Sequence, residues 1–298
     1  MAKGQFNRLI WLVDIIYRHG RISFPEINRR WLSGDHTRTP IPLRTFHNHR
    51  VAIEEIFDIN IECDKSSNSY YIADAEGLLN NKFKMWLLNS SSLNSILQEN
   101  TDVRHRVVFE DIPQGIHFMD TIVEALHKQK VLEIKYQAYS WNEPKTIGLE
   151  AYMLKQFRQR WYVIGVNREY QAFRSYSLDR ILEIQLTDIS YKLSSKITPQ
   201  RYFKDSFGII RDEKQPPCRT VLRVDSVLTP YLRALPLHAS QRETELTADH
   251  SLFELTISHT YDFVQELLSK GSQIEVLEPV SLRDRMRTET EKMYKMYE

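Results

Sequence analysis

Apolar residues near the start of the chain recur at intervals of three and four positions, the spacing that places them on one face of a helix. Phe6 to Tyr17 follow this spacing, and His19 and Gly20 are expected to end the helix. A second, short helix is expected after Ser23, with Glu26 three residues later as the partner residue of a capping box. These patterns predict two helices before residue 33.

A third helix is expected over residues 43–57, because Pro42 stands where the first turn of a helix favours proline. Two short β-type runs follow, at 60–63 and 70–73, separated by a polar turn at 64–69. Three helices followed by a hairpin is the element order of a winged helix-turn-helix. We therefore predict a DNA-binding domain of this type over residues 1–76.

The third helix has two different faces. At about 100° per residue, Phe46, Ile53 and Phe57 share one side, whereas Arg44, Asn48 and Glu55 lie opposite. The outer side carries groups that reach base edges and phosphates, and Arg50, nearer the core side, is expected to contact a phosphate or a carboxylate. The predicted DNA-binding residues are Arg44, Thr45, His47, Asn48 and Arg50 on the helix, with Lys65 and Asn68 in the hairpin turn.

The pattern changes after a connector at residues 77–117, in which a helix is expected over 80–97. One helix at 118–128 precedes five runs whose period is close to two, and the turns between them are short. This arrangement suits a small, strongly bent β-barrel better than a parallel α/β sheet. The predicted barrel domain occupies residues 118–212, with strands at 131–136, 146–155, 160–166, 172–177 and 181–186.

Pro216 and Pro217 break the chain, and the pattern that follows is strand, helix, strand, strand, helix, strand. That order is typical of a ferredoxin-like α+β sandwich, predicted here over residues 213–298. An amphipathic helix is expected at 281–297, carrying Leu282, Met286, Met293 and Tyr297. The whole chain is thus predicted to be an α+β multidomain protein.

Charge changes this picture in one place. The chain has a net charge of +1, but residues 1–50 contain nine Lys and Arg against three acidic residues. A local basic excess is the footprint expected of a module that meets phosphate, although a solvated basic face gives the same signal. The two cysteines, Cys63 and Cys218, provide neither a disulfide framework nor a zinc-ligand pair. With few glycines for phosphate loops, no cofactor or metal is expected.

No apolar run approaches the roughly 18–20 residues that a membrane span needs. The apolar stretch near the N-terminus is interrupted by Asp14 and has no small-residue cleavage site after it, so a cytoplasmic protein without a membrane partner is expected.

Several segments in the middle and end of the chain form an ordered set. Residues 160–165 (RWYVIG) and 174–181 (RSYSLDRI) resemble the signature of WYL-domain transcriptional regulators. Val163 stands where leucine is usual, and Ala151 stands where relatives often have proline. The resemblance extends, in family order, to residues 44–46 (RTF), 52–57 (AIEEIF), 61–63 (IEC), 133–136 (EIKY), 152–155 (YMLK) and 271–287.

This resemblance implies an Sm-like barrel with a basic groove that senses a ligand, in some members single-stranded nucleic acid, and a C-terminal WCX-type extension in a homodimer. Arg guanidinium groups match phosphate geometry, and aromatic faces stack on bases. Arg174 and Tyr176 share a strand face and are preferred, whereas packing also accounts for Trp161, and an ion pair with Asp179 also accounts for Arg180. The implied ligand residues are Tyr136, Tyr152, Lys155, Trp161, Tyr162, Arg174, Tyr176 and Arg180.

The leading functional hypothesis is a transcription regulator that binds double-stranded DNA and whose WYL domain senses a nucleic-acid or nucleotide ligand. The alternative is a non-catalytic accessory or scaffold protein of a defence or DNA-repair system. A nuclease is disfavoured, because His47 and His49 lie on different faces of their helix and no carboxylates converge with them. No catalytic residue is therefore predicted.

Overall fold

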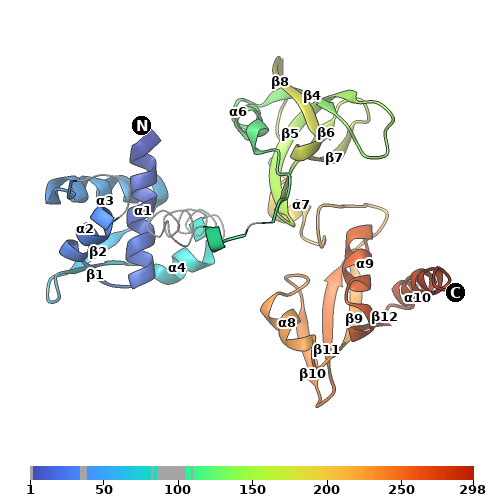
Figure 1. Ribbon diagram of the computed structural model, residues 1–298. Helices are drawn as coiled ribbons and strands as arrows, with labels where there is room; N and C mark the ends of the chain where they lie inside the picture. Colours follow the sequence, from blue (N-terminus) through green and yellow to red (C-terminus); the bar gives the residue numbers. More distant parts are fainter. Residues whose placement is uncertain (1–2, 34–38, 82–83, 86–104, 109) are drawn as a thin grey trace. The chain divides into compact units, whose positions relative to one another are not determined.

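The computed structural model describes residues 3–33, 39–81, 84–85, 105–108 and 110–298. It divides into two compact units, residues 1–110 and 111–298, which are described separately. The chain is an α+β protein with three antiparallel sheets, as Figure 1 shows. The predicted α+β multidomain class is confirmed at this level.

The N-terminal unit consists of helices packed on a small sheet. Its strands lie in the order β1-β3-β2, and both pairings are antiparallel. Helix α3 has the predicted bounds, whereas β1 and α4 were not predicted, and most of the helix predicted at 80–97 lies outside the described residues. The elements are α1 (Lys3–His19), β1 (Ile22–Ser23), α2 (Phe24–Ser33), α3 (Leu43–Phe57), β2 (Ile61–Asp64), β3 (Ser69–Ile72) and α4 (Ala75–Asn80).

Local chemistry explains where two of these helices begin and end. Ser23 Oγ accepts a hydrogen bond from the backbone N–H of Glu26 at 3.4 Å, as expected for a residue that caps α2. The Glu26 carboxylate does not complete the capping box, because it pairs with Arg29 and Arg30. Asp58 ends α3 in the left-handed region, with φ of 51°, and its N–H bonds to the Glu54 carbonyl at 2.9 Å.

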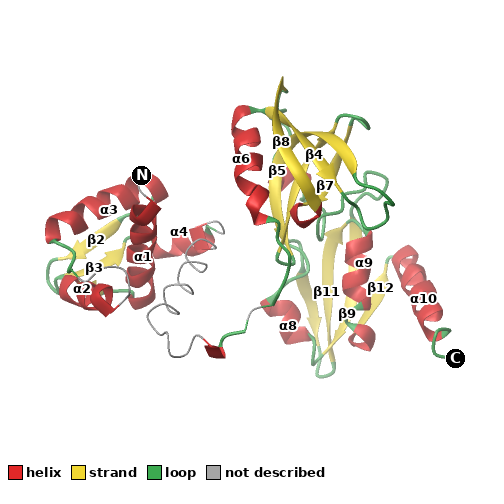
Figure 2. Cartoon of the chain, turned by 45° about the horizontal axis from the view of Figure 1, so that its top comes forward, coloured by secondary structure: helices red, strands yellow, loops and turns green. Residues whose placement is uncertain are grey.

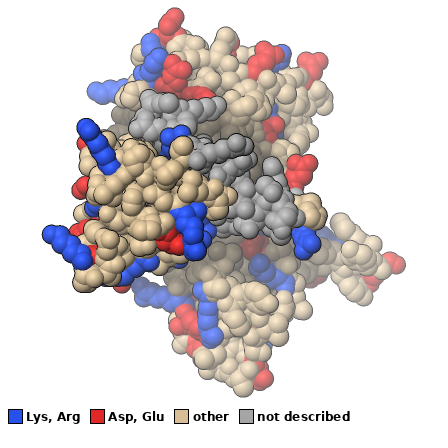
Figure 3. Space-filling model, turned by 60° about the vertical axis from the view of Figure 1, so that its left-hand side comes forward, with Lys and Arg blue, Asp and Glu red and all other residues tan. Residues whose placement is uncertain are grey.

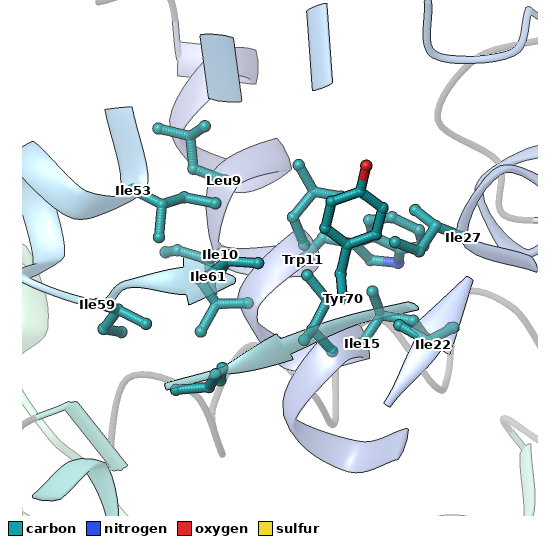
Figure 4. Packing of buried hydrophobic residues seen from close by; sticks show 14 of the residues in the cluster. Leu9, Ile10, Trp11, Ile15, Ile22, Ile27, Ile53, Ile59, Ile61 and Tyr70 are labelled. Atoms are coloured by element: carbon teal, nitrogen blue, oxygen red, sulfur yellow. The ribbon is translucent and has the colours of Figure 1, made fainter. Parts of the chain in front are cut away.

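A hydrophobic core joins the three main helices to the sheet. Figure 4 shows Ile53 of α3 beside Leu9 of α1, with Ile61 below them and Tyr70 to their right. Phe46, which is fully buried, lies 4.7 Å from the Tyr70 ring between centroids. One side of α3 is therefore fixed against the rest of its unit.

The second unit begins with a five-stranded sheet in the order β7-β6-β5-β4-β8, antiparallel throughout. Helix α6 packs on β4, β5 and β8 (Figure 2). All five strands and the helix fall close to their predicted positions. They are η2 (Ile116–Phe118), α6 (Met119–Lys128), β4 (Lys130–Tyr136), β5 (Lys145–Phe157), β6 (Arg160–Asn167), β7 (Ala172–Ser177), η3 (Leu178–Arg180) and β8 (Ile181–Ser190).

The strands of this sheet contact two separate hydrophobic clusters. The inner cluster contains Leu132, Leu149, Val163 and Tyr176 and lies against α6. The second, on the other side of β6, contains Met153, Tyr162, Ile164 and Tyr202. Because Val163 and its neighbours Tyr162 and Ile164 point to opposite faces, β6 is buried on both sides.

The C-terminal sheet has the strand order β10-β11-β9-β12 and is also antiparallel. The predicted order of strands and helices is confirmed. Helices α8, α9 and α10 supply apolar residues to its core, among them Leu232, Phe263 and Leu282. The elements are β9 (Cys218–Asp225), α8 (Thr229–Ala234), β10 (Arg242–Leu246), β11 (His250–Ile257), α9 (Tyr261–Leu268), η4 (Gly271–Gln273), β12 (Ile274–Glu278) and α10 (Val280–Tyr294).

A linking segment, residues 198–211, connects the barrel strands with the C-terminal sheet and includes α7 (Pro199–Tyr202). On one side, Lys155 Nζ donates a hydrogen bond to the Gly208 carbonyl at 2.5 Å. On the other, Asp262 Oδ2 accepts one from the N–H of Ile210 at 3.3 Å. The linking segment thus touches both parts of the second unit.

Candidate nucleic-acid and ligand surfaces

The outer face of helix α3 is exposed, as its sequence phase predicts. Phe46 and Ile53 are fully buried and His49 is 8% exposed, whereas Arg44, His47 and Asn48 are exposed and Thr45 is half-buried. Burial and the nearby Arg8 charge both lower the pKa of His49, which disfavours its charged form. The two histidines therefore face different surroundings, and only His47 is available at the surface.

Arg50 does not point to solvent. Its Nε and Nη2 both donate to the Ile61 carbonyl, the first at 2.9 Å, and its guanidinium carbon lies 5.2 Å from the centre of the Tyr70 ring. The expected contact of Arg50 with a phosphate or a carboxylate stays a prediction, since its partners in the structure are a backbone carbonyl, a ring and His47. Arg50 fixes α3 to strands β2 and β3.

The hairpin turn between β2 and β3 is held by a short polar network. Asp64 Oδ1 accepts hydrogen bonds from the Ser66 hydroxyl and N–H, at 2.6 and 2.9 Å. These bonds, the hydroxyl first, lower the pKa of Asp64 to about 2. Lys65 and Asn68 are exposed in this turn, and Asn68 takes a φ of 49°, which asparagine tolerates. Both predicted wing residues therefore project from a defined turn.

Most arginines of this unit are engaged with neighbours. Arg18 pairs with Asp14 at 2.6 Å, and Arg21 pairs with Asp64 at 2.6 Å. By contrast, Arg44 makes no ion pair within the described part of the unit. Individual Lys and Arg side chains stand out from a largely uncharged surface on the side shown in Figure 3. Arg18, Arg21, Arg29 and Arg30 thus have acidic partners, whereas Arg44 is available to an outside anion.

Three of the eight predicted ligand residues are in hydrophobic cores. Tyr136, Tyr162 and Tyr176 are 4%, 8% and 6% exposed. The Tyr176 ring lies 5.0 Å from that of Tyr136, and its hydroxyl accepts a hydrogen bond from Asn167 Nδ2 at 2.8 Å. Burial raises the pKa of both Tyr136 and Tyr176. These tyrosines fill the two hydrophobic clusters of the sheet, and their burial disfavours the predicted contact with a ligand.

Lys155 is also engaged inside the protein. Besides its bond to Gly208, its Nζ lies 3.7 Å from the centre of the Phe203 ring. Burial lowers the pKa of Lys155 to about 8, although the Asp262 carboxylate acts in the opposite direction. This amine binds the linking segment, and its contact with a ligand stays a prediction.

Tyr152, Trp161 and Arg180 are half-buried. Trp161 packs against the inner cluster, and the Tyr152 ring meets Phe173 edge-on at 5.0 Å. The Arg180 guanidinium lies 4.0 Å from the centre of the exposed Tyr139 ring. Asp179 pairs with Arg160, so the alternative that it forms an ion pair with Arg180 is wrong.

Arg174 is exposed, and its guanidinium donates a hydrogen bond to the Phe173 carbonyl at 2.9 Å. Arg174 lies 5.9 Å from the centre of the Tyr170 ring, and Arg211 lies 4.8 Å from that of Tyr202. Burial raises the pKa of Tyr202, and the charge of Arg211 acts to lower it, whereas that of Glu213, which lies 3.7 Å from Arg211 Nη2, acts to raise it. We call Tyr170, Arg174, Tyr202 and Arg211 the paired-arginine surface.

The sequence did not point to three members of this surface. Arg211 lies in the linking segment, far along the chain from Arg174, and Tyr202 is on the short helix α7. No periodicity relates them to β7, because the contact depends on how the linking segment passes the barrel. Only their residue types, arginine beside an aromatic ring, could have indicated them.

Two family models match the second unit. The WYL domain model matches residues 117–186, and the WCX domain model matches residues 216–294. The chain belongs to the family of WYL-domain proteins, and the resemblance seen in its sequence is confirmed. No curated protein matches it.

Two solved structures are similar to this chain. Proteasome accessory factor B/C (PafBC) of Arthrobacter aurescens is 18% identical over 95% of this chain, with a TM-score of 0.34. The chain spans 45% of the length of that protein. A structure described as a CRISPR Cas-related protein is 15% identical, over 100% of this chain and 87% of its own, with a TM-score of 0.38.

Two searches of the described residues found nothing. None of the helices within them is long and apolar enough to cross a membrane. Nor do they contain a group of three or more His, Cys, Asp or Glu side chains that could hold a metal ion.

Proposed function

We propose that this protein is a transcription regulator that binds double-stranded DNA through α3 and a ligand through its WYL domain. The observation that carries the proposal is the outer face of α3. Arg44, His47 and Asn48 are exposed there, on a helix whose other side is fixed in the core. Long polar side chains on a rigid helix are suited to reading the major groove.

The N-terminal unit is proposed to be a winged helix-turn-helix. Helices α1 to α3 precede a β2–β3 hairpin, and β1 pairs with β3 beside it. In this arrangement α3 is the recognition helix and the turn with Lys65 and Asn68 is the wing. The exposed Lys65 amine would meet the phosphate backbone beside the groove.

The second unit is proposed to contain an Sm-like barrel followed by a ferredoxin-like domain. Five antiparallel strands with one leading helix support the first assignment. The strand order β10-β11-β9-β12, with α8 and α9 between the strands in sequence, supports the second.

The ligand is proposed to be a nucleic acid or nucleotide, bound at the paired-arginine surface. Guanidinium groups match phosphate oxygens in a bidentate geometry, and the exposed Tyr170 ring offers a face for a base. Arg174 is the one predicted ligand residue that is both exposed and part of this surface. The proposal therefore keeps Arg174 and adds Arg211.

A homodimer in the cytoplasm is the proposed working form. The last turns of α10 and the residues after it expose Met293, Tyr294, Met296 and Tyr297, which supports a contact between copies there. Two copies would present two α3 helices to paired half-sites, and a ligand that changes their arrangement would change DNA affinity. No catalytic role is proposed.

The test of DNA binding uses a duplex selected from a randomised pool by the full-length protein. The double variant Arg44→Ala, Asn48→Ala is expected to lose about 100-fold in affinity, measured by fluorescence anisotropy. Arg29→Ala is the matched control, since Arg29 is exposed on α2 and pairs with Glu26. Unchanged affinity in the double variant would contradict the assignment of α3.

The test of ligand binding uses a single-stranded oligonucleotide and the variant Arg174→Ala, Arg211→Ala. It is expected to lose oligonucleotide binding while retaining affinity for the selected duplex. Equal loss of both indicates a folding defect, which circular dichroism identifies. A fully folded variant that still binds the oligonucleotide would favour an accessory protein that uses the barrel for protein contact.

A further inference from the structure

Val51 is an exposed apolar residue on the DNA-facing side of α3. It is 54% exposed and follows Asn48 by three positions, so the two side chains are neighbours on the helix surface. A single exposed valine is common on protein surfaces and needs no function. Here its position matters, since it stands between Asn48 and Glu55 along the same face.

We propose that Asn48 and Val51 together read a step of A·T base pairs in the major groove. An asparagine amide donates to adenine N7 and accepts from its N6 amino group, and apolar side chains contact the methyl group of thymine. The side chains are about 5–6 Å apart, a separation that reaches adjacent base pairs stacked about 3.4 Å apart along the axis. This assignment rests on the proposed DNA-binding function.

Charges on α3 determine which part of the helix enters the groove. Arg44 stands near its N-terminal end, and the exposed Glu54 and Glu55 stand near its C-terminal end. DNA phosphates attract Arg44 and repel the two glutamates. The region between them, which contains Asn48 and Val51, therefore comes closest to the base edges.

The neighbouring apolar residues argue against a protein partner at this position. Leu43 and Ile56 are also exposed on α3, at 49% and 39%. By helical phase they lie about 80° and about 140° around the helix from Val51. No continuous apolar stripe results, so Val51 suits a small apolar target such as one methyl group.

The experiment replaces thymines of the selected duplex one at a time with deoxyuridine, which lacks only the methyl group. For the wild-type protein, one replacement is expected to weaken binding about fourfold, the worth of one buried methyl group. Val51→Ala is expected to bind the thymine and deoxyuridine duplexes equally. Asn48→Ala is expected to lose at least fivefold of its preference for the adenine next to that position.

Ile56→Ala is the matched control. It removes apolar atoms from another side of the same helix and is expected to keep the fourfold methyl effect. If the wild type binds its selected duplex but no replacement weakens binding, the reading of thymine is overturned and DNA binding stands. The same holds if Val51→Ala retains the methyl effect. If no duplex can be selected, the proposed function fails and this assignment fails with it.

Discussion

Helix α3 has one face in a hydrophobic core and one in solvent, whereas strand β6 of the five-stranded sheet is buried on both sides. On α3, Phe46 and Asn48 are two positions apart and have opposite surroundings. On β6, Tyr162 and Val163 are adjacent and point in opposite directions, yet both are buried. The alternation of side chains along a strand therefore separates its two faces, but it does not reveal which face, if either, is exposed to solvent.

The cause lies in what covers each element. A helix at the edge of a small unit contacts its neighbours along one stripe. Strand β6 of the five-stranded sheet has the inner cluster on one side, and the linking segment brings Tyr202 and Phe203 to the other side. The second layer comes from a distant part of the chain, so local pattern does not reveal it.

The largest expected loss of stability comes from a substitution on the buried face of α3. Phe46→Ala removes a fully buried ring that packs against Phe24 and Tyr70, and it should lower the free energy of unfolding by about 3–5 kcal/mol. Asn48→Ala on the outer face should change it by less than about 0.5 kcal/mol. Denaturant unfolding of the full chain measures both, and similar losses would show that α3 has no free face.

A smaller effect is expected from Tyr176→Phe in the barrel. The change leaves the ring in place and removes the hydroxyl that accepts from Asn167, a buried side chain. Leaving that donor unpaired should cost about 1–3 kcal/mol in the free energy of unfolding. Arg174→Ala, at an exposed site on the same strand, should cost little. An unchanged free energy of unfolding in Tyr176→Phe would contradict the buried hydrogen bond between Asn167 and the Tyr176 hydroxyl.

A third expected effect is a pH dependence caused by Lys155. Its pKa is about 8 in the folded protein, whereas an exposed lysine has a pKa of 10.5. Below about pH 8 both folded and unfolded chains hold the proton, and between the two values the unfolded chain holds more. The free energy of unfolding of the wild type, relative to Lys155→Met, should therefore rise with pH through this window.

Denaturant titrations of both proteins at several pH values between about 7 and 10 measure this difference. Lys128→Met, at an exposed site on α6, is the matched control and should give no comparable slope. A difference that stays flat with pH would place the Lys155 amine in water, and one that falls with pH would mean a raised pKa; either result contradicts the prediction.

Much of the fold follows from local pattern. The bounds of α3 match because Pro42 and the apolar spacing define them, and the barrel strands match because turns interrupt each one. Strand β1 has only two residues and exists through its pairing with β3, which no local signal predicts.

The residues of the candidate surfaces likewise include some that local pattern indicated and some that depend on long-range contacts. Arg44, His47 and Asn48 were found from helical phase alone. The burial of Tyr136 and Tyr176 was not foreseen, because aromatic residues serve equally for stacking on a base and for filling a core. Arg211 was missed because its position depends on the path of the linking segment, a long-range property of the fold.

Gly208 in the linking segment has a consequence for how this sequence can vary. A Cβ atom there would lie 2.3 Å from Asp262 Oδ2 and 2.8 Å from the Phe157 ring. Any other amino acid would collide with side chains from two distant segments, and Asp262 is itself held by Thr260 and Ile210. Substitutions at positions 157, 208 and 262 are therefore coupled. A larger residue at 208 can be accepted in evolution only together with smaller or displaced side chains at 157 and 262.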